Sequence, residues 1–193
     1  MSTPSSRITL FASGNGSNAE KIITYFDNHS SIKVVALFSN NPRAFALTRA
    51  ERLGIPTVTF NREAFNDPER FSGLLQQFGT THIVLAGFLW LMPDYLIKEY
   101  PSKIINIHPA LLPKYGGKGM FGLKVHEAVK NASETQTGIT IHLINEKYDE
   151  GEILFQERCD IGKDYTPHQI AECVQQLEYE HYPKVIEKWV LNR

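Results

Sequence analysis

The chain has 193 residues and a net charge of −1, with 42% hydrophobic and 21% charged residues, as in an ordinary globular protein. This length predicts one domain over residues 1–193, with a parallel α/β half over about 7–110 and a completing part over about 111–193. Because the net charge is close to zero, no overall field attracts nucleic acid or an anionic membrane, and neither is expected as a partner.

The N-terminus and the cysteines indicate the compartment. The segment MSTPSSR lacks the apolar stretch of a signal peptide, and no apolar run approaches the ~20 residues of a membrane span. Cys159 and Cys173 suit a reducing environment and lack CxxC spacing. We therefore expect a cytoplasmic protein without a disulfide or a zinc site.

The hydrophobic pattern alternates strand and helix along the first half of the chain. Strands are expected at 8–13, 33–39, 56–60, 82–86 and 103–107, and helices at 18–28, 44–53, 68–78 and 93–100. Strands that are apolar on both faces and separated by helices predict a parallel sheet covered on both sides.

The hydrophobic pattern of the sequence changes after residue 115. A glycine-rich loop at 116–122 is followed by an expected helix at 123–131, alternating strands at 137–144 and 153–160, and a helix at 166–191 that Pro183 interrupts or kinks. The fold class is therefore α/β, a Rossmann-like open sheet with a parallel N-terminal half and a mixed or antiparallel C-terminal part. Ligands of such sheets bind at the carboxyl ends of the parallel strands.

The glycine-rich stretch SGNGSNAE follows the first strand and opens the first helix. It fits a relaxed dinucleotide fingerprint, but residues 39–42 after the second strand offer no carboxylate for a ribose, which disfavours an NAD dehydrogenase. A mononucleotide-sized phosphate site fits better, formed by Ser17, Asn18 and the backbone N–H groups of 16–18. The alternative is a glycine-rich turn with an ordinary N-cap.

The segment IINIHPALLPKY ends the fifth strand. Asn106 and His108 are two residues apart, so their side chains point to the same side of an extended chain. Pro109 ends the strand and Pro113 stiffens the loop. An amide that cannot ionise and an imidazole that titrates near neutrality can together polarise a carbonyl and stabilise an oxyanion.

The acidic segment NEKYDEGE at 145–152 follows a strand that carries Thr140 and His142 on one face. A carboxylate of this loop could hold the imidazolium of a catalytic histidine and raise its pKa, with Thr140 and His142 in supporting roles. The alternative is a solvated turn, and metal binding is not expected because the EF-hand pattern is missing. The residues alone leave the carboxylate open among Glu146, Asp149, Glu150 and Glu152.

The chain resembles the folate-dependent formyltransferases over nearly its whole length. The resemblance rests on SGNGSN, VLAGFLWLMP, INIHPALLPKY and GITIHLINEKYDEGEI. The HPALLP run is specific for the formyl-transfer superfamily, and GNGSN narrows the resemblance to the branch that acts on glycinamide ribonucleotide. It implies transfer of a formyl group from 10-formyltetrahydrofolate to the amine of glycinamide ribonucleotide in purine biosynthesis. The implied protein is a monomer or homodimer that uses these two small molecules and no metal.

The resemblance also implies the roles of particular residues. The catalytic residues are Asn106, His108 and Asp149. The phosphate and ribose of the ribonucleotide meet Gly14, Asn15, Gly16, Ser17, Asn18 and Glu178. The folate meets Phe88, Leu89, Trp90, Leu91 and Met92, together with Asn106.

Three departures from the family pattern stand out. Glu150 occupies a turn position that is usually Gly, and Trp90 a position that is often Arg. The loop GGKGMFG is longer than in the family. One interpretation is that Lys118 adds a positive group near an anionic substrate. The other is that the loop is a mobile lid, and its four glycines favour this second interpretation.

The rival functions predict other features. A methionyl-tRNA formyltransferase carries a further tRNA-binding domain and a formyltetrahydrofolate hydrolase a further N-terminal domain, and we expect neither here. A non-catalytic phosphate-binding module would not need His108 or Asp149. Among the other histidines, His29 is expected to be exposed, and His126 and His181 to lie on helix surfaces.

Overall fold

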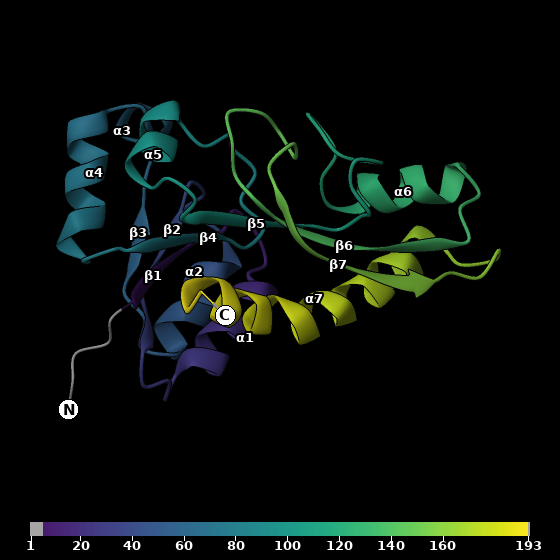
Figure 1. The fold of residues 1–193 in the computed structure, drawn as a ribbon, viewed down its shortest axis with the longest axis horizontal. Coiled ribbons are helices and arrows are strands. Elements are labelled where there is room, and N and C mark those ends of the chain that lie inside the picture. The colour runs from purple at the N-terminus through teal and green to yellow at the C-terminus, as the bar shows by residue number, and fades with distance from the viewer. Residues whose placement is uncertain (1–5, 193) are drawn as a thin grey trace.

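The computed structural model describes residues 6–192 and contains one seven-stranded sheet in the order β3-β2-β1-β4-β5-β6-β7 (Figure 1). Residues 1–5, part of the segment predicted to lack a signal peptide, and residue 193 lie outside the described residues. The strands are β1 (Ser6–Phe11), β2 (Ile32–Ser39), β3 (Thr57–Thr59), β4 (His82–Leu85), β5 (Ile104–His108), β6 (Gln136–Leu143) and β7 (Ile153–Asp160).

The sheet is parallel in its first part and antiparallel in its second. β1 pairs in parallel with both β2 and β4, and the pairs β2–β3 and β4–β5 are parallel as well. β6 runs antiparallel to both β5 and β7. The predicted fold class is confirmed, because the near-continuous apolar strands form the parallel part and the alternating strands form the antiparallel part.

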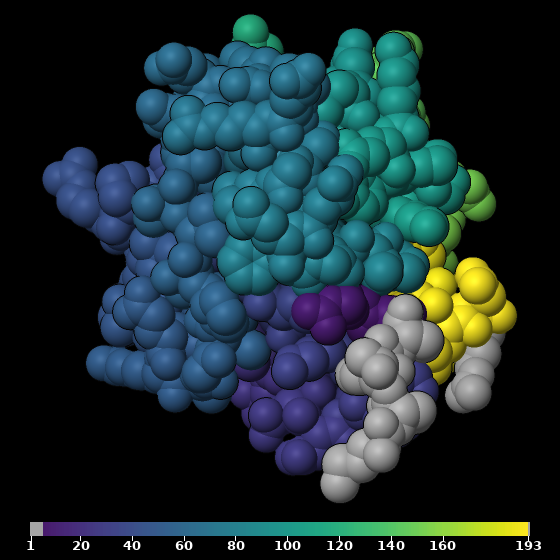
Figure 2. All heavy atoms as spheres, turned by 90° about the vertical axis from the view of Figure 1, so that its left-hand side faces the viewer, coloured from purple at the N-terminus to yellow at the C-terminus, as the bar shows by residue number. Residues whose placement is uncertain are grey.

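Helices cover both faces of the sheet. The helices are α1 (Ser17–Phe26), α2 (Phe45–Arg52), α3 (Arg62–Phe65), α4 (Pro68–Gln77), α5 (Asp94–Glu99), α6 (Leu123–Asn131) and α7 (Pro167–Val190). Apolar side chains of α1, α2 and α7 form one core with the sheet, and those of α3, α4 and α5 form a second. Figure 2 views the side of the molecule where segments of the first hundred residues make up most of the surface. The single-turn α3 was not expected from the pattern; its N-cap is Asn61, whose side chain accepts a hydrogen bond from the N–H of Ala64.

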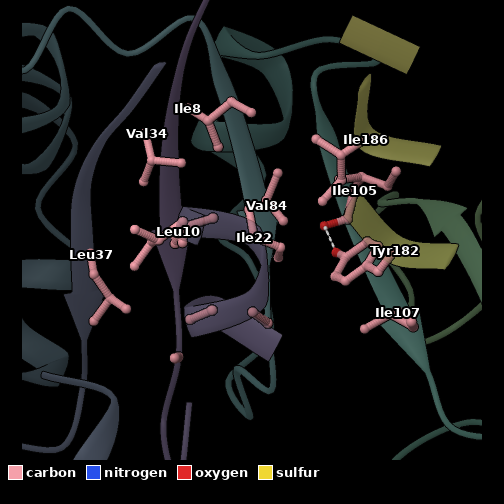
Figure 3. Packing of buried hydrophobic residues seen from close by; sticks show 14 of the residues in the cluster. Ile8, Leu10, Ile22, Val34, Leu37, Val84, Ile105, Ile107, Tyr182 and Ile186 are labelled. Atoms are coloured by element: carbon pink, nitrogen blue, oxygen red, sulfur yellow. Dashed lines mark hydrogen bonds between the residues drawn. The ribbon is translucent and has the colours of Figure 1, made fainter. Parts of the chain in front are cut away.

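The long helix α7 is anchored to the centre of the sheet (Figure 3). Tyr182 is fully buried, and its hydroxyl donates to the carbonyl of Leu85 at 2.8 Å and also approaches the carbonyl of Ile105 at 3.4 Å. The helix continues through Pro183, where an interruption or kink was expected. Tyr182 and Pro183 are both buried, so packing offsets the roughly 3 kcal/mol that an interior proline costs a helix.

The topology places three segments at one edge of the sheet. β1 lies between β2 and β4, so the strand order reverses there and leaves a crevice at the carboxyl ends of the parallel strands. Residues 14–18 follow β1, residues 87–92 follow β4, and His108 is the last residue of β5. The expected ligand-binding edge is therefore the edge that these segments share.

Candidate active site

A cavity of about 620 Å³ opens at this edge. The whole predicted folate segment lines it, namely Phe88, Leu89, Trp90, Leu91 and Met92. The three predicted catalytic residues, Asn106, His108 and Asp149, line it too, together with Asn18 and Glu178. Residues that are far apart in the chain are thus brought around one space.

The imidazole of His108 has a defined orientation. Its side chain is buried, with 3% of its surface exposed, at the end of β5. Nε2 lies 2.8 Å from the carbonyl oxygen of Tyr115, which can only accept, so Nε2 carries a proton and donates it. Nδ1 therefore faces the carboxylate of Asp149, 3.5 Å from Oδ2.

The geometry selects Asp149 from the four carboxylates that the sequence left open. Oδ2 of Asp149 accepts a hydrogen bond from the N–H of Gly117 at 2.8 Å, and Oδ1 lies 3.6 Å from Nε2 of His142. Asp149 has a backbone φ of +56°, in the left-handed region that Asp tolerates better than most residues. The other three carboxylates, Glu146, Glu150 and Glu152, are exposed.

The turn departs from the family pattern at Glu150 but keeps a close approach at the next residue. A Cβ on Gly151 would lie 1.7 Å from the carbonyl oxygen of Leu143, so this position requires glycine. The N–H of Leu143 donates to the carbonyl of Glu152 at 2.8 Å, which closes the turn. Gly151, rather than residue 150, thus lets the loop fold back toward His142.

His142 orients the amide of Asn106. The two residues lie directly opposite each other on β5 and β6. Nδ1 of His142 lies 2.9 Å from the carbonyl of Leu143 and donates to it, so in the neutral ring Nε2 accepts from Nδ2 of Asn106 at 3.2 Å. This bond fixes one amide hydrogen of Asn106.

Thr140 braces the loop that follows His108. It is fully buried, and its hydroxyl donates to the carbonyl of Ala110 at 2.7 Å. The same oxygen accepts from the N–H of Leu112 at 2.9 Å and from Nε2 of Gln156 at 2.8 Å. The proline-rich loop is thereby tied to β6 and β7, which keeps His108 in place.

The electrostatics favour a neutral His108 beside a charged Asp149. Burial lowers the pKa of His108 below its ordinary 6.5, although the Asp149 charge and the Tyr115 carbonyl act in the opposite direction. Burial alone would raise the pKa of Asp149, but its neighbours His142, His108 and the Gly117 amide lower it. At neutral pH, Nδ1 of His108 thus presents a lone pair to the cavity.

The glycine loop shapes the N-terminus of α1. Gly16 has a φ of +78°, and a Cβ there would lie 2.4 Å from the Cβ of Ala46, so the loop requires glycine at this position. No side chain caps α1, so its first N–H groups have no capping acceptor. This favours the phosphate interpretation over the ordinary N-cap. Asn15 is held by Arg49 through its backbone and side-chain oxygens.

Asn18 and Glu178 join the N-terminus of α1, after the glycine loop, to α7. Nδ2 of Asn18 donates to Oε2 of Glu178 at 2.8 Å. Burial raises the pKa of Glu178 to about 7, and the hydrogen bond from Asn18 opposes this shift. Oδ1 of Asn18 is buried and has no hydrogen-bond partner. A polar ligand in this part of the cavity would supply one.

The predicted folate segment combines buried anchors with an exposed turn. Phe88 and Met92 are buried in the second core, whereas 47% of the Leu89 surface is exposed. The N–H of Leu89 donates to the hydroxyl of Ser13 at 3.0 Å, which ties this segment to the end of β1. Trp90 stacks under the guanidinium of Arg62, whose central carbon is 3.8 Å from the ring centre.

His126 is a cavity residue that the sequence reasoning missed. It was expected on a helix surface, but only 5% of it is exposed, and it lines the cavity. Burial and the neighbouring His108 lower its pKa to about 4, and its Nδ1 has no hydrogen-bond partner. The available signal was its position beside Val125 and one turn before Val129, the buried face of α6.

Two further histidine predictions need correction. His29 was expected to be exposed, but it is half-buried, and its Nδ1 accepts from the N–H groups of Ser31 and Ile32. His181 was expected on a helix surface, but it is half-buried, and its ring packs against Phe155 with the centres 5.0 Å apart. Packing against β7 and against the segment before β2 explains both differences.

Residues 6–192 contain neither a metal-binding group of side chains nor a membrane-spanning helix. No group of three or more histidine, cysteine, aspartate or glutamate side chains in this range is arranged to hold a metal ion. No helix in this range is both long enough and apolar enough to cross a membrane.

An amide, an imidazole and a buried carboxylate meet at the strand ends of an open α/β sheet, next to an uncapped helix N-terminus. This arrangement is typical of a group-transfer enzyme that handles a phosphorylated substrate. The formyl transferase family matches residues 6–186, and the chain belongs to this family.

Several similar proteins carry the name phosphoribosylglycinamide formyltransferase. A chloroplastic phosphoribosylglycinamide formyltransferase of Arabidopsis thaliana is 37% identical in an alignment of 186 positions that covers 93% of this chain and 64% of that protein. The phosphoribosylglycinamide formyltransferase of Bacillus subtilis is 34% identical over 94% of this chain and 93% of its own length. The crystal structure of the Brucella melitensis phosphoribosylglycinamide formyltransferase superposes with a TM-score of 0.85 at 32% identity, covering 95% of each chain. The chain thus spans less than two thirds of the Arabidopsis relative but nearly all of the bacterial ones.

Proposed function

We propose that the chain transfers the formyl group of 10-formyltetrahydrofolate to the amine of glycinamide ribonucleotide, a step of purine biosynthesis. The observation that carries this proposal is the meeting of Asn106, His108 and Asp149 in one cavity with the folate segment 88–92 and with Asn18. Family membership and the names of the bacterial relatives support it.

The ribonucleotide would bind from the side of α1 and α7. Its phosphate fits the uncapped N-terminus of α1, where the N–H groups of Ser17 and Asn18 and the helix dipole favour an anion. Its ribose hydroxyls would meet Glu178, which already bonds Asn18. This placement directs the glycinamide amine toward the end of β5.

The formyl donor would bind from the side of β4. Residues 88–92 offer an apolar surface, and the buried Nδ1 of His126 lacks a hydrogen-bond partner on the same cavity wall. A flat heterocycle with polar edges fits such a lining. The donor supplies a formyl carbon that an amine can attack. Lys118, which is exposed and also lines the cavity, adds a positive charge near two anionic substrates.

His108 would act first as a base. Its Nε2 proton is committed to Tyr115, and its lowered pKa keeps the ring neutral, so Nδ1 can take the proton that the attacking amine releases. The resulting imidazolium lies 3.5 Å from Asp149, whose charge stabilises it. The same proton can then pass to the leaving nitrogen of the folate.

Asn106 would stabilise the oxyanion that forms on the formyl oxygen. His142 fixes one of its amide hydrogens, which leaves the second free to donate toward the cavity. A neutral donor that is held in place before the reaction costs no reorganisation in the transition state. In this scheme His108 joins as an oxyanion donor only after it has accepted a proton.

A formyl-transfer assay with purified protein, glycinamide ribonucleotide and 10-formyltetrahydrofolate tests the proposal. We expect turnover by the wild type and a loss of about 10³-fold in kcat for His108→Ala. His168→Ala serves as the matched control, because His168 is exposed and lies outside the cavity lining. Folate binding without turnover would point to another formyl acceptor, such as methionyl-tRNA. Absence of folate binding would leave a phosphate-binding module.

A further inference from the structure

Tyr115 has a backbone conformation that a bulky residue rarely adopts. Its φ is +57°, in the left-handed region, although the next two residues are glycines that would adopt this conformation more easily. Such strain persists only where surrounding contacts hold the residue, and it is concentrated at functional sites. The side chain of Tyr115 does not line the cavity, so any link to the site is made by its main chain.

The main chain at 115–117 contacts both members of the catalytic pair. The carbonyl oxygen of Tyr115 accepts a hydrogen bond from Nε2 of His108 at 2.8 Å. Two residues later, the N–H of Gly117 donates to Oδ2 of Asp149 at 2.8 Å. The same Oδ2 lies 3.5 Å from Nδ1 of His108. One short loop thus sets the position of the imidazole relative to the carboxylate.

Two acceptors compete for the one ring proton of neutral His108. The carboxylate of Asp149 faces Nδ1, and the carbonyl of Tyr115 faces Nε2. A carboxylate is the stronger acceptor, so charge alone would place the proton on Nδ1. Distance favours Nε2, because 2.8 Å is an ordinary hydrogen-bond length and 3.5 Å exceeds the usual range. The placement of the Tyr115 carbonyl therefore decides whether Nδ1 keeps its lone pair.

The side chain of Tyr115 anchors this carbonyl from outside the cavity. Its hydroxyl donates to Oε1 of Glu134 at 2.8 Å, and Glu134 lies in the connection between α6 and β6. The same Oε1 accepts from Nζ of Lys114 at 2.8 Å. The ring packs against three buried residues of α6, α7 and the end of β7, namely Val129, Ile161 and Ile170. A hydrogen bond and an apolar contact thus hold the residue in its strained conformation.

We propose that Tyr115, anchored by Glu134, is a positioning residue that holds His108 as the Nε2–H tautomer and so keeps Nδ1 free to act as the base. If the anchor is lost, the carbonyl can move away, and the ring proton passes from Nε2 to Nδ1 with no change in charge. Nδ1 then donates to Asp149 and cannot accept a proton from the attacking amine. The catalytic consequence rests on the proposed function, whereas the tautomer is a property of the resting protein.

Nitrogen-15 NMR of histidine-labelled protein at about pH 8 tests the tautomer, because the neutral ring predominates there. The His108→Ala spectrum identifies the His108 signals among those of the seven histidines. We expect only the Nε2–H tautomer in the wild type and a clear Nδ1–H fraction in Tyr115→Phe and in Glu134→Ala.

Tyr25→Phe is the matched control for this spectrum. Tyr25 is exposed and lies outside the cavity lining, and its hydroxyl also donates to a glutamate, Glu187. Its removal should leave His108 entirely in the Nε2–H form. An unchanged tautomer in both Tyr115→Phe and Glu134→Ala would overturn the proposal, and so would an equal Nδ1–H fraction in the control.

Steady-state kinetics provide the second readout. Tyr115→Phe should lower kcat about tenfold and leave the KM of both substrates nearly unchanged, because it removes one hydrogen bond to a charged group and no substrate contact. Glu134→Gln can still accept from the Tyr115 hydroxyl and should recover most of what Glu134→Ala loses. The double variant Tyr115→Phe/Glu134→Ala should be no slower than the slower single variant, since both changes remove the same bond.

The outcomes separate this inference from the proposed function. A rise in KM without a fall in kcat, or multiplied losses in the double variant, would overturn the positioning role. An inactive wild type whose His108 tautomer responds as expected would refute formyl transfer alone. An active wild type whose Tyr115 and Glu134 variants keep both the tautomer and kcat would refute the positioning role alone.

Discussion

The site draws on two regions that position their residues in different ways. In the parallel half, Asn106 and His108 stand on a regular strand, and the phosphate loop joins a strand directly to a helix. In the C-terminal part, Asp149 lies on a loop with a φ of +56° and is held by the N–H of Gly117. Local backbone geometry thus places the first set, whereas contacts between distant segments place the second.

The difference has a chemical consequence. The groups from the parallel half are neutral at rest, because burial keeps the pKa of His108 low and an amide does not ionise. The charge comes from Asp149, whose pKa is lowered by neighbours on β5, β6 and the loop after residue 115. In the proposed mechanism, the strand half thus supplies a preorganised base and oxyanion donor, and the loop half supplies the countercharge.

The largest effect should follow from removing the strand-borne base. For His108→Ala we expect kcat to fall about 10³-fold with little change in KM, because the ring acts on the reaction rather than on binding. Steady-state kinetics beside the His168→Ala control would measure this. Near-normal turnover of His108→Ala would remove His108 from the mechanism and break the comparison between the two regions.

Removing the loop charge should have a smaller effect. For Asp149→Asn we expect a fall of about 10² in kcat, since the imidazolium of His108 loses its countercharge but keeps its place. Asp149 raises the pKa of His108, so its loss lowers that pKa further, and the acid limb of the pH–rate curve should move to lower pH. Glu150→Gln, at an exposed neighbour paired with Lys147, is the control. An unmoved acid limb would contradict the coupling between Asp149 and His108.

The phosphate loop offers a test of backbone placement. For Gly16→Ala we expect the free energy of unfolding to fall by about 2 kcal/mol, because Gly16 has a positive φ and a Cβ there would collide with Ala46. Gly73→Ala in α4 meets nothing within 4 Å and should instead stabilise the protein by up to about 1 kcal/mol. Denaturant unfolding of both variants would measure the contrast. Equal effects would show that the loop tolerates a side chain.

The smallest effect concerns the buried His126. Its pKa is about 4 in the folded protein and about 6.5 when unfolded, so between these values the unfolded chain binds more protons. Its contribution to stability is therefore complete above pH 6.5 and is lost as the pH falls toward 4. At pH 5.5 we expect this to lower the free energy of unfolding by about 1.4 kcal/mol in the wild type but not in His126→Gln.

The His126 test requires the free energy of unfolding of wild type and of His126→Gln to be compared at each pH. Glu178 has a raised pKa of about 7 and acts in the opposite direction, so the wild-type curve alone combines both effects. Unfolding of wild type and His126→Gln at pH 7.5 and at pH 5.5 separates them. The same change in both proteins would mean that His126 binds its proton without unfolding.

Much of this molecule could be read from residue order. The alternation of apolar strands and helices gives the sheet, because strands buried on both faces must be apolar throughout. Spacing by two puts Asn106 and His108 on one side, and a glycine loop between strand and helix predicts an anion site. These are short-range consequences of backbone geometry, and the element bounds in the structure lie within a few residues of those expected.

The remaining features depended on the packing of distant segments. The residues by themselves left four carboxylates open and the family resemblance implied Asp149. The folded loop, held by Gly117 and turned at Gly151, brings Asp149 to His108. His126 looked like a surface residue because α6 packs against segments far away in the chain. The sequence by itself thus determined the sheet, the strand-end pair and the glycine loop after the first strand. The tertiary structure decided which carboxylate and which protons come together, because these depend on distances between segments that no local pattern encodes.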